Sequence, residues 1–229
     1  MGFKKTLNNL SNSMELIIIL IIGFGFPLFF STFSLLGLSS EYNQSWLIRL
    51  TSQGFYIIVA HEIIALIVIL YILKVRGMNF KTFDFGFSFR LILVALLLVF
   101  VSYILRGFLY MVLKLTELLP ETFVNNTHNN LQVNWISLAL VTIINSFYEE
   151  FILIGYIFKR LEKYHPAIII GLSLLIRESY HTYQGWISLL VIIPMGLIFG
   201  LYYYRYKKLW PVIMAHGFSN LFTFWSMEI

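Results

Sequence analysis

The chain has 229 residues, of which 59% are hydrophobic and 12% charged, and its mean hydropathy is +0.81. A soluble domain is about half apolar and about a quarter charged, so this composition excludes an ordinary globular surface and predicts a protein that lies in lipid. The net charge is +5, but the Lys and Arg residues form no basic stripe, so we expect no nucleic-acid partner. The lack of cysteine excludes disulfides and thiolate chemistry.

Seven apolar runs follow one another along the chain, and each is continuous, which favours helices over the alternating strands of a membrane barrel. A spanning helix needs about 20 mostly apolar residues, so we expect an all-α, polytopic bundle of about seven transmembrane helices in a single membrane domain over residues 1–229. The runs are approximately Leu16–Gly37, Gln53–Leu73, Arg90–Leu113, Val133–Phe158, Ala167–Tyr183, Trp186–Tyr204 and Leu209–Ser226.

Basic residues concentrate at the start of the chain and in alternate loops between the runs. The positive-inside rule therefore predicts a cytoplasmic N-terminus and an external C-terminus. The basic segments hold Lys4 and Lys5; Lys74, Arg76, Lys81 and Arg90; Lys159, Arg160 and Lys163; and Arg205, Lys207 and Lys208, whereas the other loops hold Arg49 and Lys114.

Ionisable residues inside the runs are functional candidates, because each costs about 2.5–3.5 kcal/mol at mid-membrane on insertion scales. Adjacent helical residues point about 100° apart, so two neighbours cannot face one point. The candidates are His61 and Glu62 in the second run, Arg106 in the third, Glu149 and Glu150 in the fourth, Arg177, Glu178 and His181 in the fifth, and His216 in the seventh. For His61 and Glu62 we expect a structural role.

Glu149 and Glu150 are the first candidates for chemistry, since two adjacent carboxylates in an apolar helix are hard to explain as packing. Glu149 lies about 14 Å from the cytoplasmic end of its run, near the midplane. One glutamate could act as a general base while the other orients or pairs with a neighbour. The alternative is a structural ion pair with Arg106 or Arg177.

Polar residues on two later runs could complete a site for water attack on an amide. His216 and Asn220 are spaced i, i+4 on one helix face, where they could donate hydrogen bonds to an oxyanion or make a helix–helix contact. His181 lies at a polar helix end, as part of the site or as an interfacial cap, and by counting lies farther toward the outside than Glu149. Glu149, His181 and His216 could instead hold a metal such as zinc, although the His-Glu-x-x-His signature is absent.

In order, these motifs resemble the CPBP family of intramembrane proteases, also called the CAAX protease or Abi family, in its Gram-positive bacterial form. The first family motif is Glu-Glu-x-x-x-Arg, and here Ile154 stands at the Arg position. The second is Phe-x-x-x-His, which here reads Arg177 to His181, followed by Tyr183-Gln184-Gly185. The third, His-x-x-x-Asn, matches His216 and Asn220. The resemblance covers roughly Asn145 to Asn220, and it suggests residues 133–226 as the catalytic core.

The resemblance implies that Glu149 and His181 activate water, that His216 and Asn220 stabilise the oxyanion, and that Glu150 supports the site. Ile154 puts the positioning of the substrate or of the second glutamate in question. Family members have been described both as metalloproteases and as metal-independent enzymes. We expect an intramembrane endopeptidase of the bacterial plasma membrane that cleaves a small hydrophobic or membrane-attached peptide.

Two other functions fit the sequence. One is a catalytically inactive member of the same fold that regulates a membrane partner or confers bacteriocin immunity. The other is a small proton-coupled transporter in which the buried Glu and His residues form a relay. A transporter predicts inverted repeats with broken helices in both halves, whereas the polar residues here concentrate in the C-terminal half.

Overall fold

The computed structural model describes residues 2–35, 51–118, 133–182 and 186–226, and its regular elements are helices. A helix lies over each of the seven predicted runs, which confirms the all-α prediction. These helices are α2 (Asn12–Leu35), α4 (Ser52–Val75), α5 (Phe89–Leu115), α6 (Trp135–Glu150) with its continuations η4 (Phe151–Tyr156) and α7 (Ile157–Arg160), α8 (Pro166–His181), α9 (Trp186–Tyr206) and α10 (Trp210–Ser226). Two short elements, α1 (Gly2–Asn8) and η2 (Phe80–Thr82), complete the described part. Arg49 and the predicted segment Tyr183–Gly185 lie outside the described residues.

Four helical segments of the described chain are long and apolar enough to cross a membrane: Asn12–Phe33, Ser52–Val75, Phe89–Leu115 and Trp135–Arg160. Their mean hydropathies range from 1.5 to 2.5, and these values identify a multi-pass membrane protein. The full count of seven crossings and the cytoplasmic N-terminus stay predictions.

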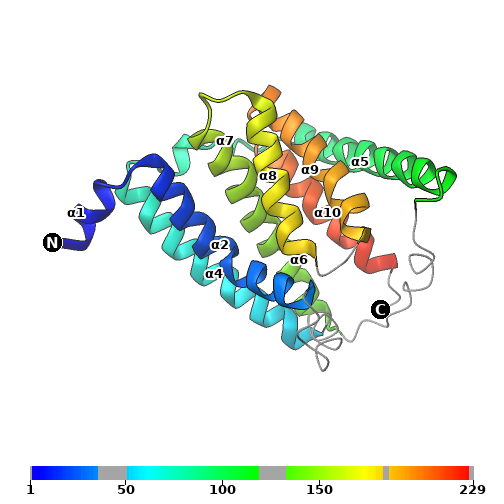
Figure 1. Cartoon of the computed structure of the whole chain (residues 1–229), viewed down its shortest axis with the longest axis horizontal. Coiled ribbons are helices and arrows are strands. Elements are labelled where there is room, and N and C mark those ends of the chain that lie inside the picture. Colours follow the sequence, from blue (N-terminus) through cyan, green and yellow to red (C-terminus); the bar gives the residue numbers. More distant parts are fainter. Residues whose placement is uncertain (1, 36–50, 119–132, 183–185, 227–229) are drawn as a thin grey trace.

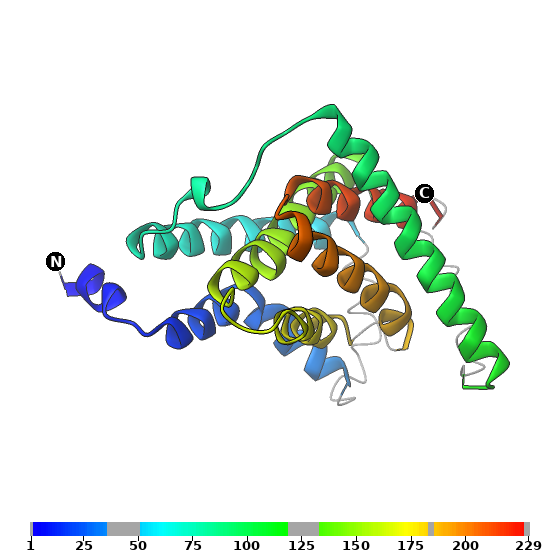
Figure 2. The same cartoon turned by 90° about the horizontal axis from the view of Figure 1, so that it is seen from above.

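The long helices form two rows that pack against each other. One row contains α4, α6 and α10, with α6 in the middle, and the other contains α2, α8 and α9, with α8 in the middle. Helix α5 contacts both α9 and α10 and so closes one end of the two rows (Figures 1 and 2). The fourth and fifth helical segments of the sequence are therefore the middle elements of the two rows.

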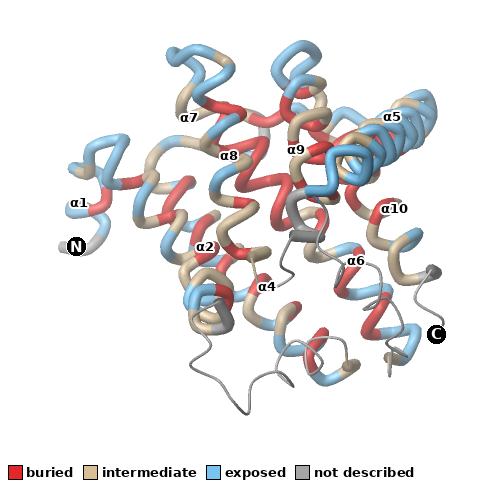
Figure 3. The backbone as a smooth tube through the Cα atoms, turned by 45° about the vertical axis from the view of Figure 1, so that its right-hand side comes forward, coloured by how far each residue is buried: buried red, intermediate tan, exposed pale blue. Residues whose placement is uncertain are grey.

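Burial follows this arrangement (Figure 3). In the segment that contains α6 and η4, 67% of the most apolar stretch is buried, against 22% to 33% in the other three candidate spans. Helix α5 instead exposes a stripe of large apolar side chains at helical spacing, the surface expected to meet lipid: Leu93, Leu97, Phe100, Ile104, Phe108, Met111 and Leu115. The polar candidates of α6 thus lie in the protein interior and away from lipid.

Side chains at the helix starts set where the spans begin. The hydroxyl of Thr51 accepts a hydrogen bond from the Gly54 amide at 3.1 Å, and the side chain of Asn134 accepts one from the Ser137 amide at 2.8 Å. Such caps satisfy amide groups that have no partner within the first helical turn. Helix α8 begins at Pro166, whose missing N–H costs nothing at that position.

Candidate active site

Glu149 and Glu150 are the last two residues of α6, and they are 4% and 0% exposed. The six residues that follow form the π-helix η4, in which every residue is buried. A π-helical turn inside an α-helix is rare and is frequently found at functional sites, because it changes the direction of the side chains that flank it. The chain therefore changes its helical pitch directly after the two carboxylates.

Gly155 allows the neighbouring chain to approach η4 closely. A Cβ atom at this position would lie 3.1 Å from Leu209 Cδ2 and 3.5 Å from Phe83 Cδ1. Both contacting residues come from the loops that flank α5 and α10, and both are buried. The absent side chain thus lets two loops pack against the helix that carries the glutamates.

Arg177 of α8 forms ion pairs with both glutamates. Its Nη1 lies 2.8 Å from Glu150 Oε1 and 3.3 Å from Glu149 Oε2, and its Nη2 donates to Glu150 Oε2 at 3.0 Å. Arg177 is itself fully buried, and it packs beside Gly196 of α9. Of the two arginines considered from the sequence, Arg177 makes the pair, whereas Arg106 of α5 lies with its guanidinium 5.7 Å from the ring centroid of Tyr103.

The position of Arg177 bears on the unusual first motif. Ile154, which stands where the resemblance places an arginine, is 1% exposed inside η4 and adds only apolar packing. The guanidinium against Glu150 comes instead from α8, at the position where the second motif has a phenylalanine. In this chain a cation from a different helix therefore neutralises the second glutamate.

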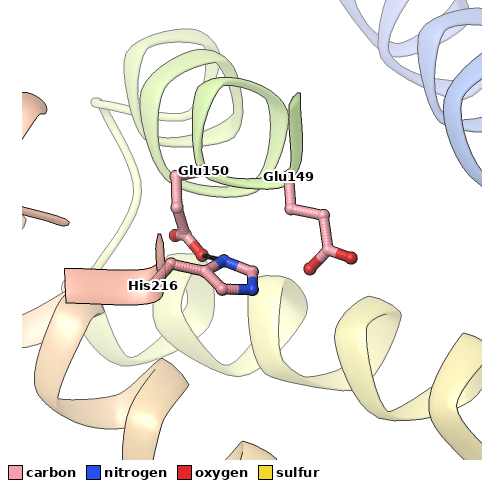
Figure 4. Close-up of side chains that lie close together, drawn as sticks. All are labelled: Glu149, Glu150 and His216. Atoms are coloured by element: carbon pink, nitrogen blue, oxygen red, sulfur yellow. Dashed lines mark hydrogen bonds and ion pairs between the residues drawn. The ribbon is translucent and has the colours of Figure 1, made fainter. Parts of the chain in front are cut away.

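His216 of α10 completes a compact group with the two glutamates (Figure 4). Its Nδ1 lies 2.7 Å from Glu150 Oε1, and its side chain is buried. One ligand atom from each of Glu149, Glu150 and His216 lies within 4.8 Å of the other two. Because a carboxylate oxygen can only accept, Nδ1 is the donor in the contact with Glu150. The predicted site residues of α6 and His216 of α10 thus meet in the protein interior.

His181 and Asn220, the other two predicted site residues, lie outside this three-residue group. His181 is the last residue of α8, its ring centroid is 4.5 Å from that of Tyr180, and it interacts electrostatically with Glu149. Asn220 donates from Nδ2 to Ser146 Oγ at 3.4 Å, one helical turn before Glu149 and Glu150. Both residues are half-buried and border the group.

Two polar side chains around the glutamates, Asn145 and Tyr180, were not predicted from the sequence, and Glu62 was predicted only as a structural residue. Asn145 donates to Glu149 Oε1 at 2.9 Å and to Glu62 Oε1 at 2.6 Å. Tyr180 lies close enough to Glu149 to interact electrostatically, although its hydroxyl falls short of hydrogen-bond geometry. The i, i+4 spacing of Asn145 and Glu149 was a usable signal for the first contact, but nothing in the sequence connects either residue to Glu62.

Comparison with known proteins shows which family the segment with these residues matches. Residues 131–222 match the family model described as Type II CAAX prenyl endopeptidase Rce1-like. The chain carries an Rce1-like domain of the CPBP/Abi family. A UPF0177 protein, YbdI, from Lactococcus lactis subsp. lactis (strain IL1403) is 29% identical over 164 residues, which are 69% of this chain and 88% of that protein. No solved structure matches the chain at a comparable level of significance.

The Rce1-like domain contains Glu149, Glu150, Arg177 and His216, whereas Glu62 lies on α4, outside the matched range. A buried group of carboxylates and an imidazole in this domain is consistent with a hydrolytic active site. The recognition of the family from its three short motifs is therefore confirmed.

The Rce1-like domain does not fit a bound divalent metal in this arrangement. The metal ligands considered from the sequence were Glu149, His181 and His216, but the group that comes together has Glu150 in place of His181. The guanidinium of Arg177 contacts oxygens of both glutamates, so a metal held by them would lie beside a fixed positive charge. These side chains are therefore arranged to pair with Arg177 and with one another.

Proposed function

We propose that this chain is an intramembrane endopeptidase that hydrolyses a peptide bond in a small hydrophobic or membrane-attached peptide of the bacterial plasma membrane. In this proposal the chain crosses the membrane seven times from a cytoplasmic N-terminus, and residues 133–226 form the catalytic core. The observation that supports it is the buried meeting of Glu149, Glu150 and His216 in the Rce1-like domain, at a depth where uncompensated ionisable groups are costly.

The different contacts of the two glutamates support different roles for them in this proposal. Glu150 accepts one hydrogen bond from Arg177 Nη2 and one from His216 Nδ1, and its Oε1 also forms an ion pair with Arg177 Nη1, so both of its oxygens are engaged. Glu149 accepts a longer hydrogen bond of 3.3 Å from Arg177 Nη1 and one of 2.9 Å from Asn145, which leaves lone pairs available to a water molecule. Glu149 is therefore the general base that takes the proton of the attacking water, with His181 next to it as the second water-positioning group.

His216 is suited to stabilise the oxyanion that forms when water attacks the amide. Glu150 accepts a hydrogen bond from Nδ1 of His216, which orients the ring, and in the protonated ring Nε2 also carries a proton. That second N–H can be donated to the developing negative charge, and Asn220, one turn later on α10, supplies a further donor. Arg177 stays outside the chemistry and keeps the Glu150 carboxylate oriented.

A non-catalytic regulator of a membrane partner is the second candidate function, and the ion pairs favour it. Both glutamates are bonded to Arg177, and this is the arrangement expected if their role were to hold α6, α8 and α10 together. Such a protein would need the ion pair but no general base, and it would release no cleavage product.

The test compares peptides from the membranes and medium of cells that express wild-type protein or the Glu149→Gln variant at matched levels, by mass spectrometry. Gln keeps the size of the side chain and an acceptor for Asn145, but it cannot take a proton from water. We expect fragments that appear with wild-type protein and are absent with the variant. Glu162→Gln is the matched control, because Glu162 is exposed just after the end of α7 and its ion pair within the described residues is with Lys159.

Fragments common to wild type and Glu162→Gln would support the endopeptidase and identify its substrate class. If the three peptide profiles are the same across growth conditions, the endopeptidase proposal is wrong. The regulator then becomes the better explanation, and it predicts that Glu149→Gln retains the cellular phenotype of the wild type while Arg177→Leu loses it.

A further inference from the structure

A third buried carboxylate lies beside the site and belongs to none of the family motifs. Glu62 is near the middle of α4 and is 5% exposed. Its Oε2 is buried and has no hydrogen-bond partner, and within the described residues no cation forms an ion pair with it. A buried carboxyl group with one hydrogen bond is costly to keep, so packing alone does not explain its presence.

Among the described residues, the side-chain hydrogen bond of Glu62 is to Asn145, the residue that also holds Glu149. Asn145 Nδ2 lies 2.6 Å from Glu62 Oε1 and 2.9 Å from Glu149 Oε1. An amide NH₂ group has two hydrogens, and here each is donated to a different carboxylate. The two acceptors together fix which way the Asn145 amide points.

The packing around Glu62 does not depend on its carboxylate. Helices α4 and α6 already meet through a buried apolar cluster, which consists of Phe55, Val59, Leu138 and Val141. Glu62 and Asn145 follow these residues at helical spacing on the same two faces, so an apolar side chain at position 62 would extend the cluster. The carboxylate therefore serves something other than the contact between the helices.

We propose that Glu62 is a positioning residue for Glu149 and acts through Asn145. Asn145 holds Glu149 Oε1 while Arg177 holds Oε2, so the carboxylate of the base is fixed at both oxygens. Without Glu62, the Asn145 amide can rotate and turn its carbonyl oxygen toward Glu149, which replaces a hydrogen bond by a repulsion. This inference rests on the proposed endopeptidase function and extends the site to α4.

The test uses purified full-length protein in detergent and an internally quenched peptide that spans the cleavage site found in the wild-type-dependent fragments. A displaced catalytic group can cost about 100-fold, so we expect Glu62→Leu to lower kcat by roughly 10- to 100-fold while KM stays within about twofold. Glu62→Gln should restore most of the rate, because its amide oxygen can accept the Asn145 hydrogen. A role in packing alone would not produce this difference between Leu and Gln.

His61→Leu is the matched control, because His61 is the neighbouring residue on α4 and its ring stacks on Phe26 at 5.0 Å, away from Asn145. The melting temperature of each variant is measured alongside. If Glu62→Leu does not fold, Asn145→Leu breaks the same link from the other side and should show the same loss of kcat. The Glu62→Leu, Asn145→Leu double variant should be no slower than Asn145→Leu alone.

Glu149→Gln separates failure of this inference from failure of the proposed function. If Glu149→Gln abolishes cleavage while Glu62→Leu and Asn145→Leu keep the wild-type rate, the endopeptidase stands and the positioning role of Glu62 is overturned. A folded Glu62→Gln variant that is as slow as Glu62→Leu also overturns it, since the amide acceptor would then be without effect. If Glu149→Gln cleaves like wild type, both proposals are overturned.

Discussion

The guanidinium of Arg177 contacts the carboxylate of Glu150 through two N–O pairs, at 2.8 and 3.0 Å. Both side chains are fully buried. A bidentate pair of this kind fixes direction as well as charge, and it joins α8 to the end of α6. Because His216 also bonds to Glu150, the pair connects three helices at one carboxylate. The geometry of the candidate site therefore depends on a residue that the family motif does not provide.

Removing the Arg177 side chain should destabilise the protein strongly. In Arg177→Leu, Glu149 and Glu150 would remain buried without their cation, and breaking one side of a buried ion pair typically costs about 3–5 kcal/mol. We expect a lower melting temperature in detergent, a lower yield of folded protein and loss of cleavage. Thermal unfolding of the purified variant measures the first effect directly.

Two further variants show whether the planar pair of donors of Arg177 matters or only its positive charge. Arg177→Lys keeps a cation but lacks the planar pair of donors, so it should recover part of the stability and less of the activity. Arg106→Leu removes a half-buried arginine from α5 that stacks on Tyr103, and its effect on stability should be small. Equal losses of stability in Arg177→Leu and Arg106→Leu would contradict a specific role for the Arg177 guanidinium.

Chelators should leave the cleavage rate unchanged. Arg177 already neutralises the glutamates, and the carboxylates and His216 bond to one another or to Arg177. Protein dialysed against EDTA and analysed for metal content should cleave the quenched peptide at the rate of untreated protein. Loss of activity that zinc restores would show that the glutamates rearrange around a metal and that the ion pairs are a resting arrangement.

Hydropathy was enough to predict the helices of this fold. The second predicted run, Gln53–Leu73, corresponds to α4 at Ser52–Val75, and the third, Arg90–Leu113, corresponds to α5 at Phe89–Leu115. Length and apolarity decide such segments because lipid leaves the backbone no alternative to a helix. The two rows of helices could not be predicted in the same way, since nearly every face of each run is apolar and the sequence does not show which face packs inward.

The site was predictable only as far as its motifs are local. Glu149, Glu150 and His216 could be selected because charge in an apolar helix is conspicuous, but choosing Arg177 over Arg106 requires the rotation of α8 and α5 about their axes. The contact of Asn145 with Glu62 joins residues 83 positions apart, and no spacing rule reaches that far. The π-helix η4 has no sequence signature that we recognise, although it follows the glutamates directly.

Glu15 is the centre of a second ion cluster and should matter for stability. It is fully buried at the start of α2, where it accepts hydrogen bonds from Arg76 Nε at 2.6 Å, from Tyr156 at 2.9 Å and from Arg160. These contacts join α2 to the ends of α4 and α7. Glu15→Leu would leave two arginines without their carboxylate, so we expect a loss of about 3–5 kcal/mol in the free energy of unfolding.

The control for Glu15 is a glutamate in an ion pair at the surface. Lys159 and Glu162 are 2.8 Å apart but 39% and 52% exposed, and such a pair is worth about 0–1 kcal/mol. Glu162→Leu should therefore barely change the melting temperature. Similar shifts in both variants would mean that the buried position of Glu15 contributes nothing beyond an ordinary surface pair.

Asp84, in the loop between α4 and α5, should make the free energy of unfolding depend on pH in the acidic range. A hydrogen bond from Lys208, which precedes α10, and one from the Gly86 amide at 2.9 Å hold the pKa of Asp84 below its usual value. A carboxyl group whose pKa is lowered by folding stabilises the fold above its unfolded pKa, about 3.9, and this stabilisation is lost as the pH falls through the lower folded value.

Thermal unfolding of wild type and Asp84→Asn between about pH 6 and pH 3 tests this contribution. The difference in melting temperature between the two proteins should be largest at the upper end of the range and should shrink as Asp84 becomes protonated. Because Asp84 and Lys208 are 41% and 44% exposed, water and salt screen the pair, so the difference should also shrink in about 1 M NaCl. A difference that stays constant over this pH range would contradict a contribution from the charge of Asp84, because the backbone hydrogen bond from the Leu209 amide to the Asp84 carbonyl is the same in both proteins.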